Sequence, residues 1–514
     1  MNYKALLYST SLGVLLCATG CKKDKFNINE NQDDITESSV TTSALLPAAL
    51  QATSDIVSTN WTFMQMWMGY WARSGSYQSQ TDIETYRFTN NFQQSVWNDL
   101  YANAKNYDLM QKKAEALDQG FYDAVGRIMR SHNFQILVDV YNNVPYFNAF
   151  KGTAVPTPAY DNGIDIYRDL FKQLDTAVSL LQGPTGGEVG NPDSETADFV
   201  YEGDSESWIR FANTLRLRMI LHLHNGMNGN QVVPGIDIAE QLGKITGEGF
   251  INAGQSAHLN PGFSASKPQP FFRVYNTDES GTSSRSDDVR ANAYAINYYD
   301  HLGDPRLDMF YTEGSAGHLG IPFGTPAGDP DYEGSDLSTV RGPGLSPDGA
   351  ASRAWIITSV ESLFLQAEAR QRGLLTTGPS AAELLTAAVQ ESFEWLGLTA
   401  EDANDYLNGN VGSPDVDYTA TGGGLFTILS QKWFALNAIA PFEIWTDYRR
   451  TNIVYGAPAG FDAGPPISID PGNTATSIPV RLFYPQNEYN YNAENVAAQG
   501  TIDVFTSKIF WDLN

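Results

Sequence analysis

Aromatic and planar hydrogen-bonding side chains concentrate in one early stretch of the chain, residues 60–78. Trp67 and Trp71 stand four residues apart, so on a helix they would share a face near its end. Sugars stack their C–H faces on such rings and offer hydroxyl groups to guanidinium and amide groups. We therefore expect a site for a carbohydrate-type ligand, built from Trp67, Trp71, Arg73, Tyr77 and Gln78. Of these, Arg73, Tyr77 and Gln78 are expected to lie in a loop.

The same aromatics also suit a second interpretation, in which the first helices pack their rings into the core. We expect this for Trp61, Phe63 and Met64. From Trp71 onward the chain turns polar, and both interpretations stay open.

A middle stretch offers a second group of aromatic residues, Pro270–Asn276. Phe272 and Tyr275 are candidates for the opposite wall of the same ligand site. The alternative is a loop that tucks its own rings inward, and the sequence does not separate the two.

Metal-binding and catalytic patterns give little signal. The acidic stretch Asp329–Asp336 begins like a calcium loop, but the position of its closing glutamate is occupied by Val340, so we expect a solvated turn. His222 and His224 stand two apart and would point to different faces of a helix. No Gly-x-Ser-x-Gly, His-Glu-x-x-His or phosphate-binding Gly-Lys-Ser/Thr motif occurs. We expect no metal, no cofactor and no catalytic residue, although a glycosidase needs only two well-placed carboxylates.

The first residues have the layout of a bacterial export signal. Lys4 precedes an apolar run, and after Cys21 the chain turns abruptly polar. Small residues directly before Cys21 are similar to a lipobox, although Ala18 stands where that pattern usually has leucine. This resemblance implies cleavage before Cys21 and attachment of lipid to it. We expect a signal peptide over residues 1–20 and a lipidated flexible tether over residues 21–42.

Composition agrees with export and argues against nucleic acid. The formal net charge is −27, with 59 acidic against 32 basic residues, whereas a polyanionic backbone is bound by clustered Lys and Arg. Both cysteines, Cys17 and Cys21, lie in the leader or at the lipidation site. The rest of the chain therefore has no disulfide, and at this length its core does not require one.

Apolar residues at three- and four-residue spacing predict a mostly helical chain. The first helix is predicted to start near Ser43, and Gly373 is a plausible helix-ending glycine. The longer helices are predicted over residues 92–117, 121–141, 164–181, 205–224, 354–372, 381–396 and 425–440. Paired amphipathic helices favour an all-α fold of tetratricopeptide-like pairs, with a non-repeating all-α globule as the alternative.

Two long stretches rich in Gly, Pro, Ser and Asp interrupt these helices, at about 246–350 and 456–500. Loops this long carry function or small structures of their own. We therefore expect one large domain over residues 43–514 with two insertions.

Several motifs, in order along the chain, resemble the SusD/RagB nutrient-binding lipoproteins of Bacteroidetes outer membranes. They are Trp208–Arg218, Asp304–Asp308, Glu361–Arg370 before Gly373, Gln431–Leu436, Glu443–Thr451, Ile478–Pro485 and Lys508–Asp512. The resemblance implies an all-α, tetratricopeptide-like body with a loop-rich half. It also implies a lipid-anchored protein on the outer face of the outer membrane, which binds a nutrient, most often a glycan and sometimes a peptide, for a SusC-like TonB-dependent transporter.

The charged residues of these motifs have a structural interpretation. Arg210, Arg216 and Arg218 lie among apolar helix positions, so we expect them to pair with carboxylates between helices. The same is expected of Glu443, Asp447, Arg449 and Arg450. Two other functions stay open: a surface-anchored glycoside hydrolase, and a tetratricopeptide scaffold for protein partners.

Overall fold

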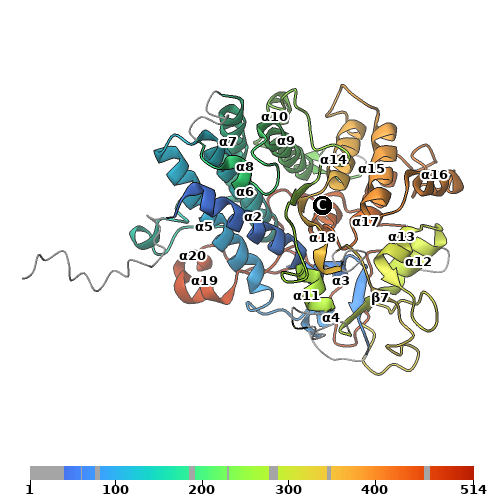
Figure 1. Ribbon diagram of the computed structural model, residues 1–514. Coiled ribbons are helices and arrows are strands. Elements are labelled where there is room, and N and C mark those ends of the chain that lie inside the picture. Colours follow the sequence, from blue (N-terminus) through green and yellow to red (C-terminus); the bar gives the residue numbers. More distant parts are fainter. Residues whose placement is uncertain are drawn as a thin grey trace, which may run out of the picture. The chain divides into compact units, whose positions relative to one another are not determined.

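The computed structural model describes residues 40–59, 61–75, 81–183, 191–227, 231–276, 280, 287–343, 349–456 and 463–514. The chain divides into two compact units, Met1–Thr41 and Thr42–Asn514. The predicted signal peptide and Cys21 lie outside the described residues. The second unit is built from helices with only short strands among its described residues, which confirms the predicted all-α class (Figure 1).

The first half of this unit is a row of helices that pack on their neighbours in sequence. Figure 1 shows α5, α6 and α7 side by side, with α2 across them. The apolar spacing predicted the long helices to within a few residues, and the buried side chains of α7, such as Leu170 and Leu174, follow it. The bounds are α2 Thr42–Thr59, α5 Gln94–Ala116, α6 Gly120–Tyr141, α7 Gly163–Gln182 and α9 Ser205–His222.

A second row of helices follows in the last third of the chain, and α14 and α15 form its closest pair. Its bounds are α14 Ser359–Gln371, α15 Ala381–Trp395, α16 Ala400–Gly409, α17 Leu425–Ala435 and α18 Pro441–Thr451. The prediction of helix from residue 354 was wrong, because Ala354–Ile357 form strand β8, paired with β4 at Ala257–Leu259. The helix predicted over 425–440 ends at Ala435.

The predicted middle insertion contains small structures of its own. Its helices are α11 Pro270–Tyr275, α12 Ala293–His301 and α13 Arg306–Phe310. Among the described residues the strands form two-stranded antiparallel pairs, β1–β5, β2–β3, β4–β8 and β6–β7. Their bounds are β1 Trp71–Arg73, β2 His224–Asn225, β3 Gln231–Val232, β5 Val289–Ala291, β6 Tyr311–Thr312 and β7 Thr339–Val340.

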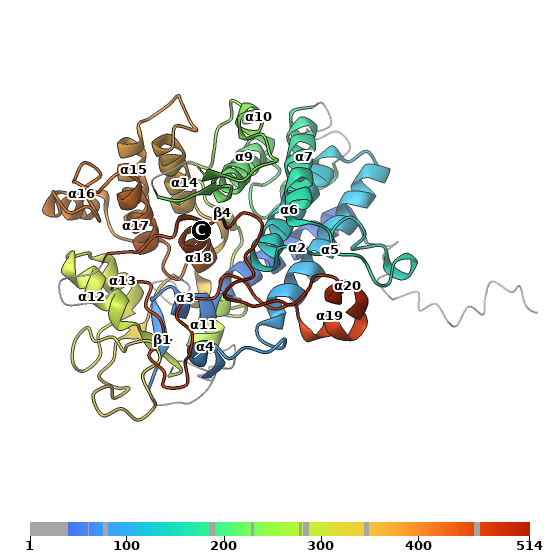
Figure 2. The ribbon, with the colours of Figure 1, turned by 180° about the vertical axis from the view of Figure 1, so that it is seen from behind.

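Short elements complete the unit: α3 Thr62–Trp67, α4 Thr81–Thr85, η2 Gly152–Ala154, α8 Ser194–Ala197, α10 Ile238–Gly243, η3 Gly349–Ala351, α19 Gln486–Tyr491 and α20 Ala493–Ala497. Both views place the end of the chain next to α18 (Figures 1 and 2). Asn514 there donates a hydrogen bond from Nδ2 to the Arg449 carbonyl at 2.8 Å.

Charged side chains cross the core between the two rows of helices. The Arg218 guanidinium on α9 lies 2.5 Å from Glu361 on α14 and 3.4 Å from Glu443 on α18. His222, one turn later, contacts Asp139 on α6 at 3.0 Å and Glu443 at 3.1 Å. Burial alone would lower the pKa of His222, but the charges of Glu443 and Asp139 raise it above its ordinary value.

A second buried group joins α14 to α18. The Arg450 guanidinium donates to both Glu368 carboxylate oxygens, at 2.7 and 2.6 Å, and to Asp447 at 2.6 Å. Arg372, at the end of α14, also pairs with Glu368, with 2.7 Å between its Nε and the carboxylate Oε1. Burial would raise the pKa of Glu368, but the charges of Arg450 and Arg372 outweigh it and hold that pKa well below its usual range.

The predicted pairing of arginines with carboxylates between helices is confirmed for Arg216, Arg218 and Arg450. Arg216, for example, lies 2.6 Å from Asp175 on α7. It is wrong for two others. Arg210 pairs with Glu206 on its own helix at 3.2 Å. Arg449 donates to the Asp139 and Val480 carbonyls and lies over the Trp445 and Trp511 rings, because its surroundings offer backbone oxygens and π faces.

Candidate functional site

The early aromatic segment forms a helix, a tight turn and a strand, and the turn decides where its rings point. The amide of Gly69 donates to the Met66 carbonyl at 3.1 Å, and that of Tyr70 to the Gln65 carbonyl at 2.9 Å. With a φ of +80° at Gly69, this is a Schellman helix end. The prediction that Trp67 and Trp71 share a helix face was therefore wrong: α3 ends at Trp67, and Trp71 begins β1.

Both indole side chains lie inside the core. Trp67 has an exposed fraction of 0%, and its ring contacts Phe63, Phe92 and Trp445 at centroid distances between 4.9 and 6.2 Å. Trp71 has an exposed fraction of 1%. In this structure neither ring presents a face to solvent, so their direct part in ligand binding stays a prediction.

The structure does bring the early segment and the middle insertion together. Strand β1 pairs antiparallel with β5, with Trp71 opposite Ala291. The Trp71 ring meets Phe271 and Tyr275 of α11 edge to face, at centroid distances of 5.7 and 5.5 Å. Tyr275 has an exposed fraction of 9% and donates its hydroxyl to Thr62 Oγ1 at 3.0 Å. The contact is thus part of the core beneath the insertion.

Phe272, the other candidate of the middle insertion, is half-buried. Its ring lies against Gly349, where an added Cβ would come within 3.1 Å of it. It therefore lies nearer the surface than Tyr275, which follows it by three positions on α11.

Arg73 is buried at the end of β1. Its Nε donates to Glu84 of α4 at 2.8 Å, and its Nη2 to the Thr325 carbonyl at 3.3 Å. Burial raises the pKa of Glu84, and the charge of Arg73 opposes that shift. The guanidinium thus ties α4 and the middle insertion to β1. Tyr77 and Gln78, which follow in sequence, lie outside the described residues.

The acidic stretch at 329–336 forms turns held by its own side chains, such as the Asp331 amide donating to Asp329 at 3.0 Å. In the part of the chain that the structure describes, no three His, Cys, Asp or Glu side chains are grouped to hold a metal ion.

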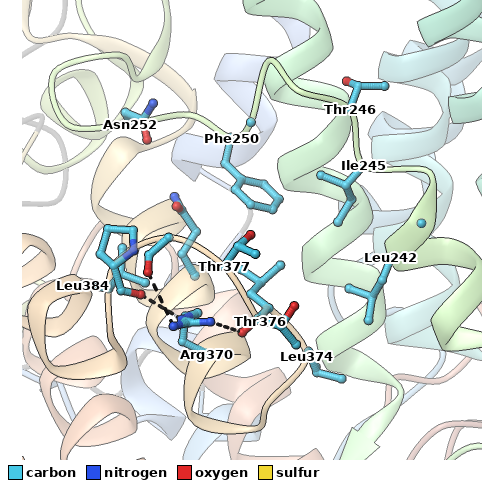
Figure 3. Close-up of a pocket in the computed structure, with 16 residues that line it drawn as sticks. Leu242, Ile245, Thr246, Phe250, Asn252, Arg370, Leu374, Thr376, Thr377 and Leu384 are labelled. Atoms are coloured by element: carbon cyan, nitrogen blue, oxygen red, sulfur yellow. Dashed lines mark hydrogen bonds between the residues drawn. The ribbon is translucent and has the colours of Figure 1, made fainter.

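A cavity of about 570 Å³ lies elsewhere, between residues 242–252 and the turn that joins α14 to α15 (Figure 3). None of its lining side chains is among the site residues predicted from the sequence. Its two walls are more than 100 residues apart, and their Thr, Leu and Gly residues have no distinctive spacing.

The family model of SusD-like proteins, described as starch-binding and associating with the outer membrane, matches residues 32–485. The chain belongs to the SusD-like family. No curated protein is similar enough in sequence to be compared with it.

Solved structures show the same fold. A chitin-binding SusD homologue from Flavobacterium johnsoniae superposes with a TM-score of 0.73 at 24% identity, over 92% of this chain and 99% of that one. A SusD homologue from Bacteroides fragilis gives 0.70 at 18% identity, over the same shares. A SusD-like protein from Bacteroides thetaiotaomicron gives 0.67 at 21% identity, again over 92% and 99%. At these identities the likeness establishes the SusD-like helical architecture.

Proposed function

We propose that this SusD-like protein is a non-catalytic, lipid-anchored receptor that binds a nutrient glycan at the cell surface and delivers it to a SusC-like TonB-dependent transporter. The match of the family model over residues 32–485 carries this proposal. Glycan is favoured over peptide because the family is described as starch-binding, and one solved relative as chitin-binding.

The anchoring part of the proposal rests on Cys21. A cysteine at the end of an apolar leader, followed by a polar stretch, is the arrangement that lipidation requires. None of the helices described by the structure is both long and apolar enough to cross a membrane. Attachment through lipid on Cys21 is consistent with the family's association with the outer membrane.

We place the ligand at the loops that leave β1 and α11. Trp67, Trp71, Arg73 and Tyr275 are buried there and act as the frame. The contacts to sugar fall to Tyr77 and Gln78, which follow β1 in sequence, and to the half-buried Phe272. This division keeps the residues predicted from sequence but separates those that support the loops from those that touch ligand.

A glycoside hydrolase would need two carboxyl groups facing a scissile bond. Three buried carboxyl groups, those of Glu361, Glu368 and Glu443, instead form ion pairs with arginines on other helices. Their arrangement supports a role in packing and favours binding without catalysis.

The decisive experiment titrates the mature protein, in a non-glycosidic detergent, with chitin and starch oligosaccharides and with short peptides, while checking for cleaved products. Tyr77→Ala and Phe272→Ala are each expected to weaken glycan binding roughly 3- to 10-fold, since a stacked ring is worth about 0.5–1.5 kcal/mol. Tyr491→Ala, whose ring is 77% exposed on α19, is the matched control.

Binding without cleavage, weakened in the two site variants only, supports the proposal. Cleavage of a glycan would contradict the proposal and show that the protein is a glycoside hydrolase. Absence of affinity for every saccharide and peptide would favour a scaffold for protein partners. Purification from the native outer membrane should also recover a TonB-dependent barrel, and a preparation without one would contradict the transport role.

A further inference from the structure

The cavity beside the α14–α15 turn lies away from the loops of β1 and α11. In both views α10, α14 and α15 lie at the top, whereas α11 and α4 lie at the bottom (Figures 1 and 2). Its volume of about 570 Å³ lies within the range of about 300–1,000 Å³ that is typical of small-ligand sites.

One wall is a turn that local hydrogen bonds hold in place. Gly373, with a φ of +73°, ends α14 in a Schellman motif, in which the Leu374 amide donates to the Ala369 carbonyl at 2.8 Å. Arg370 donates from its guanidinium to the carbonyls of Leu375 and Pro379 farther along the turn, at 2.5 and 2.8 Å. The exposed Thr376 and Thr377 side chains are therefore presented by an ordered backbone.

The other wall is held by α9. Asn213, fully buried on that helix, donates from Nδ2 to Thr246 Oγ1 at 3.2 Å and to the Gly249 carbonyl at 2.8 Å. The amide of Ile251 donates to Thr214 Oγ1 at 3.0 Å. These bonds bracket Phe250, whose ring points toward Thr377 across the cavity (Figure 3).

Both walls of the cavity carry apolar and hydrogen-bonding side chains. Phe250, Leu242 and Ile245 supply an aromatic ring and two aliphatic side chains, while Thr376, Thr377 and Asn252 supply hydroxyl and amide groups. A pyranose ring offers the same two kinds of surface, an apolar C–H face and hydroxyl groups around its edge.

Charge on the lining points to a neutral ligand. Arg370 is the one ionisable side chain among the 16 lining residues. Its guanidinium already donates to three carbonyls of its own turn, those of Leu375, Gly378 and Pro379. A ligand carrying several charges would have to leave water without compensating groups, which is costly.

We propose that this cavity is a second glycan subsite, which takes one neutral sugar ring with its C–H face against Phe250 and its hydroxyl groups on Thr376 and Thr377. This rests on the proposed function, since it assigns an additional contact for the same class of nutrient. Two separated subsites on one protein would strengthen the capture of a long polymer by raising the effective concentration of the second contact.

The test is isothermal titration of the detergent-solubilised mature protein with chitotriose and maltotriose. In the Tyr77→Ala background, which weakens the loop site, a saturable step is expected to remain for one of the two saccharides. Adding Thr376→Val and Thr377→Val should weaken that step roughly 10- to 100-fold, because two hydrogen bonds are lost and each is worth roughly 3- to 10-fold. Thr386→Val, an exposed position on α15 outside the cavity, is the matched control.

Because both threonines are exposed, the double variant should keep the wild-type thermal midpoint. A saccharide-binding step that the double variant leaves unchanged would overturn the subsite. So would a cavity that binds a capped neutral pentapeptide instead of either saccharide. Both outcomes would leave glycan capture at the β1 and α11 loops intact. A wild-type protein that binds neither saccharide would refute the subsite, and the full glycan panel then decides the proposed function separately.

Discussion

At Arg450 and Glu368, two charged hydrogen bonds of 2.7 and 2.6 Å join side chains that water does not reach. Taking both charges out of water costs several kcal/mol, and their attraction roughly offsets this, so the pair adds little net stability. Removing one partner is different, because it strands a buried charge and costs about 3–5 kcal/mol. The pair thus acts mainly by requiring α14 and α18 to meet in one way.

The protonation of Glu368 predicts how stability depends on pH. Its pKa is held below the ordinary value of 4.5, so the unfolded chain takes up a proton at higher pH than the folded protein does. The stability that it contributes is present above pH 4.5 and is lost as the pH falls below that value. Urea unfolding followed by circular dichroism at pH 7, 4.5 and 3.5 should show this loss.

Glu368→Gln supplies the comparison for this prediction. The variant should be less stable at pH 7 because Arg450 keeps only Asp447 as a charged partner and Arg372 loses its ion pair with Glu368. Its free energy of unfolding should then fall less steeply than that of the wild type below pH 4.5, since one titrating carboxyl is gone. Equal slopes in the two proteins would contradict the assignment.

Among the elements, the turn from α3 to β1 is tightly constrained and leads into the proposed ligand loops. Gly69 has a φ of +80°, and a Cβ built there would lie 2.8 Å from both Pro466 and Tyr294. Left-handed backbone costs a non-glycine residue about 1–2 kcal/mol, and overpacking adds about 1–3 kcal/mol. Both terms oppose substitution at this position.

Gly69→Ala is therefore expected to lower the free energy of unfolding by about 2–4 kcal/mol, measured by urea denaturation. Gly500→Ala is a matched control, because Gly500 has a similar φ of +77° but nothing within 4 Å of an added Cβ. It should lose only the backbone contribution. Equal losses in the two variants would show that the contacts with Pro466 and Tyr294 are unimportant.

At the scale of the whole folded unit, the last residues of the chain join segments from its two halves. Trp511 is fully buried, and its Nε1 donates to Asp139 of α6 at 2.6 Å. Its carbonyl accepts from Asn225 of β2 at 2.7 Å, and Arg449 of α18 lies over its ring at 4.7 Å. The unit is thus closed by residues more than 280 positions away from some of their partners.

Trp511→Ala is expected to destabilise the protein by about 3–5 kcal/mol, the usual cost of removing a large buried aromatic side chain. Leu513→Ala is the control, since the side chain of Leu513 is 43% exposed and should contribute little. Thermal unfolding of both variants beside the wild type provides the measurement. A Trp511→Ala protein as stable as Leu513→Ala would show that these last residues are dispensable for closure.

Local patterns determined much of this protein without tertiary information. Apolar spacing predicted α6 and α7 nearly to the residue, and Gly373 marked the end of α14. Arginines at otherwise apolar helix positions correctly predicted the ion pairs of Arg216, Arg218 and Arg450. These succeed because helix periodicity, capping and the cost of an unpaired buried charge act through residue type and near neighbours.

Contacts between distant segments were decided only by the tertiary structure. Nothing local indicated that β1 would pair with β5 some 218 residues later, or that Trp71 would be buried by Phe271 and Tyr275. The cavity beside Phe250 depends likewise on two segments that meet only when α9 packs on α14. The sequence thus determined the family, most of the helices and the ion pairs of Arg216, Arg218 and Arg450. Packing decided which aromatic rings are buried and which walls enclose a cavity, because burial depends on long-range neighbours.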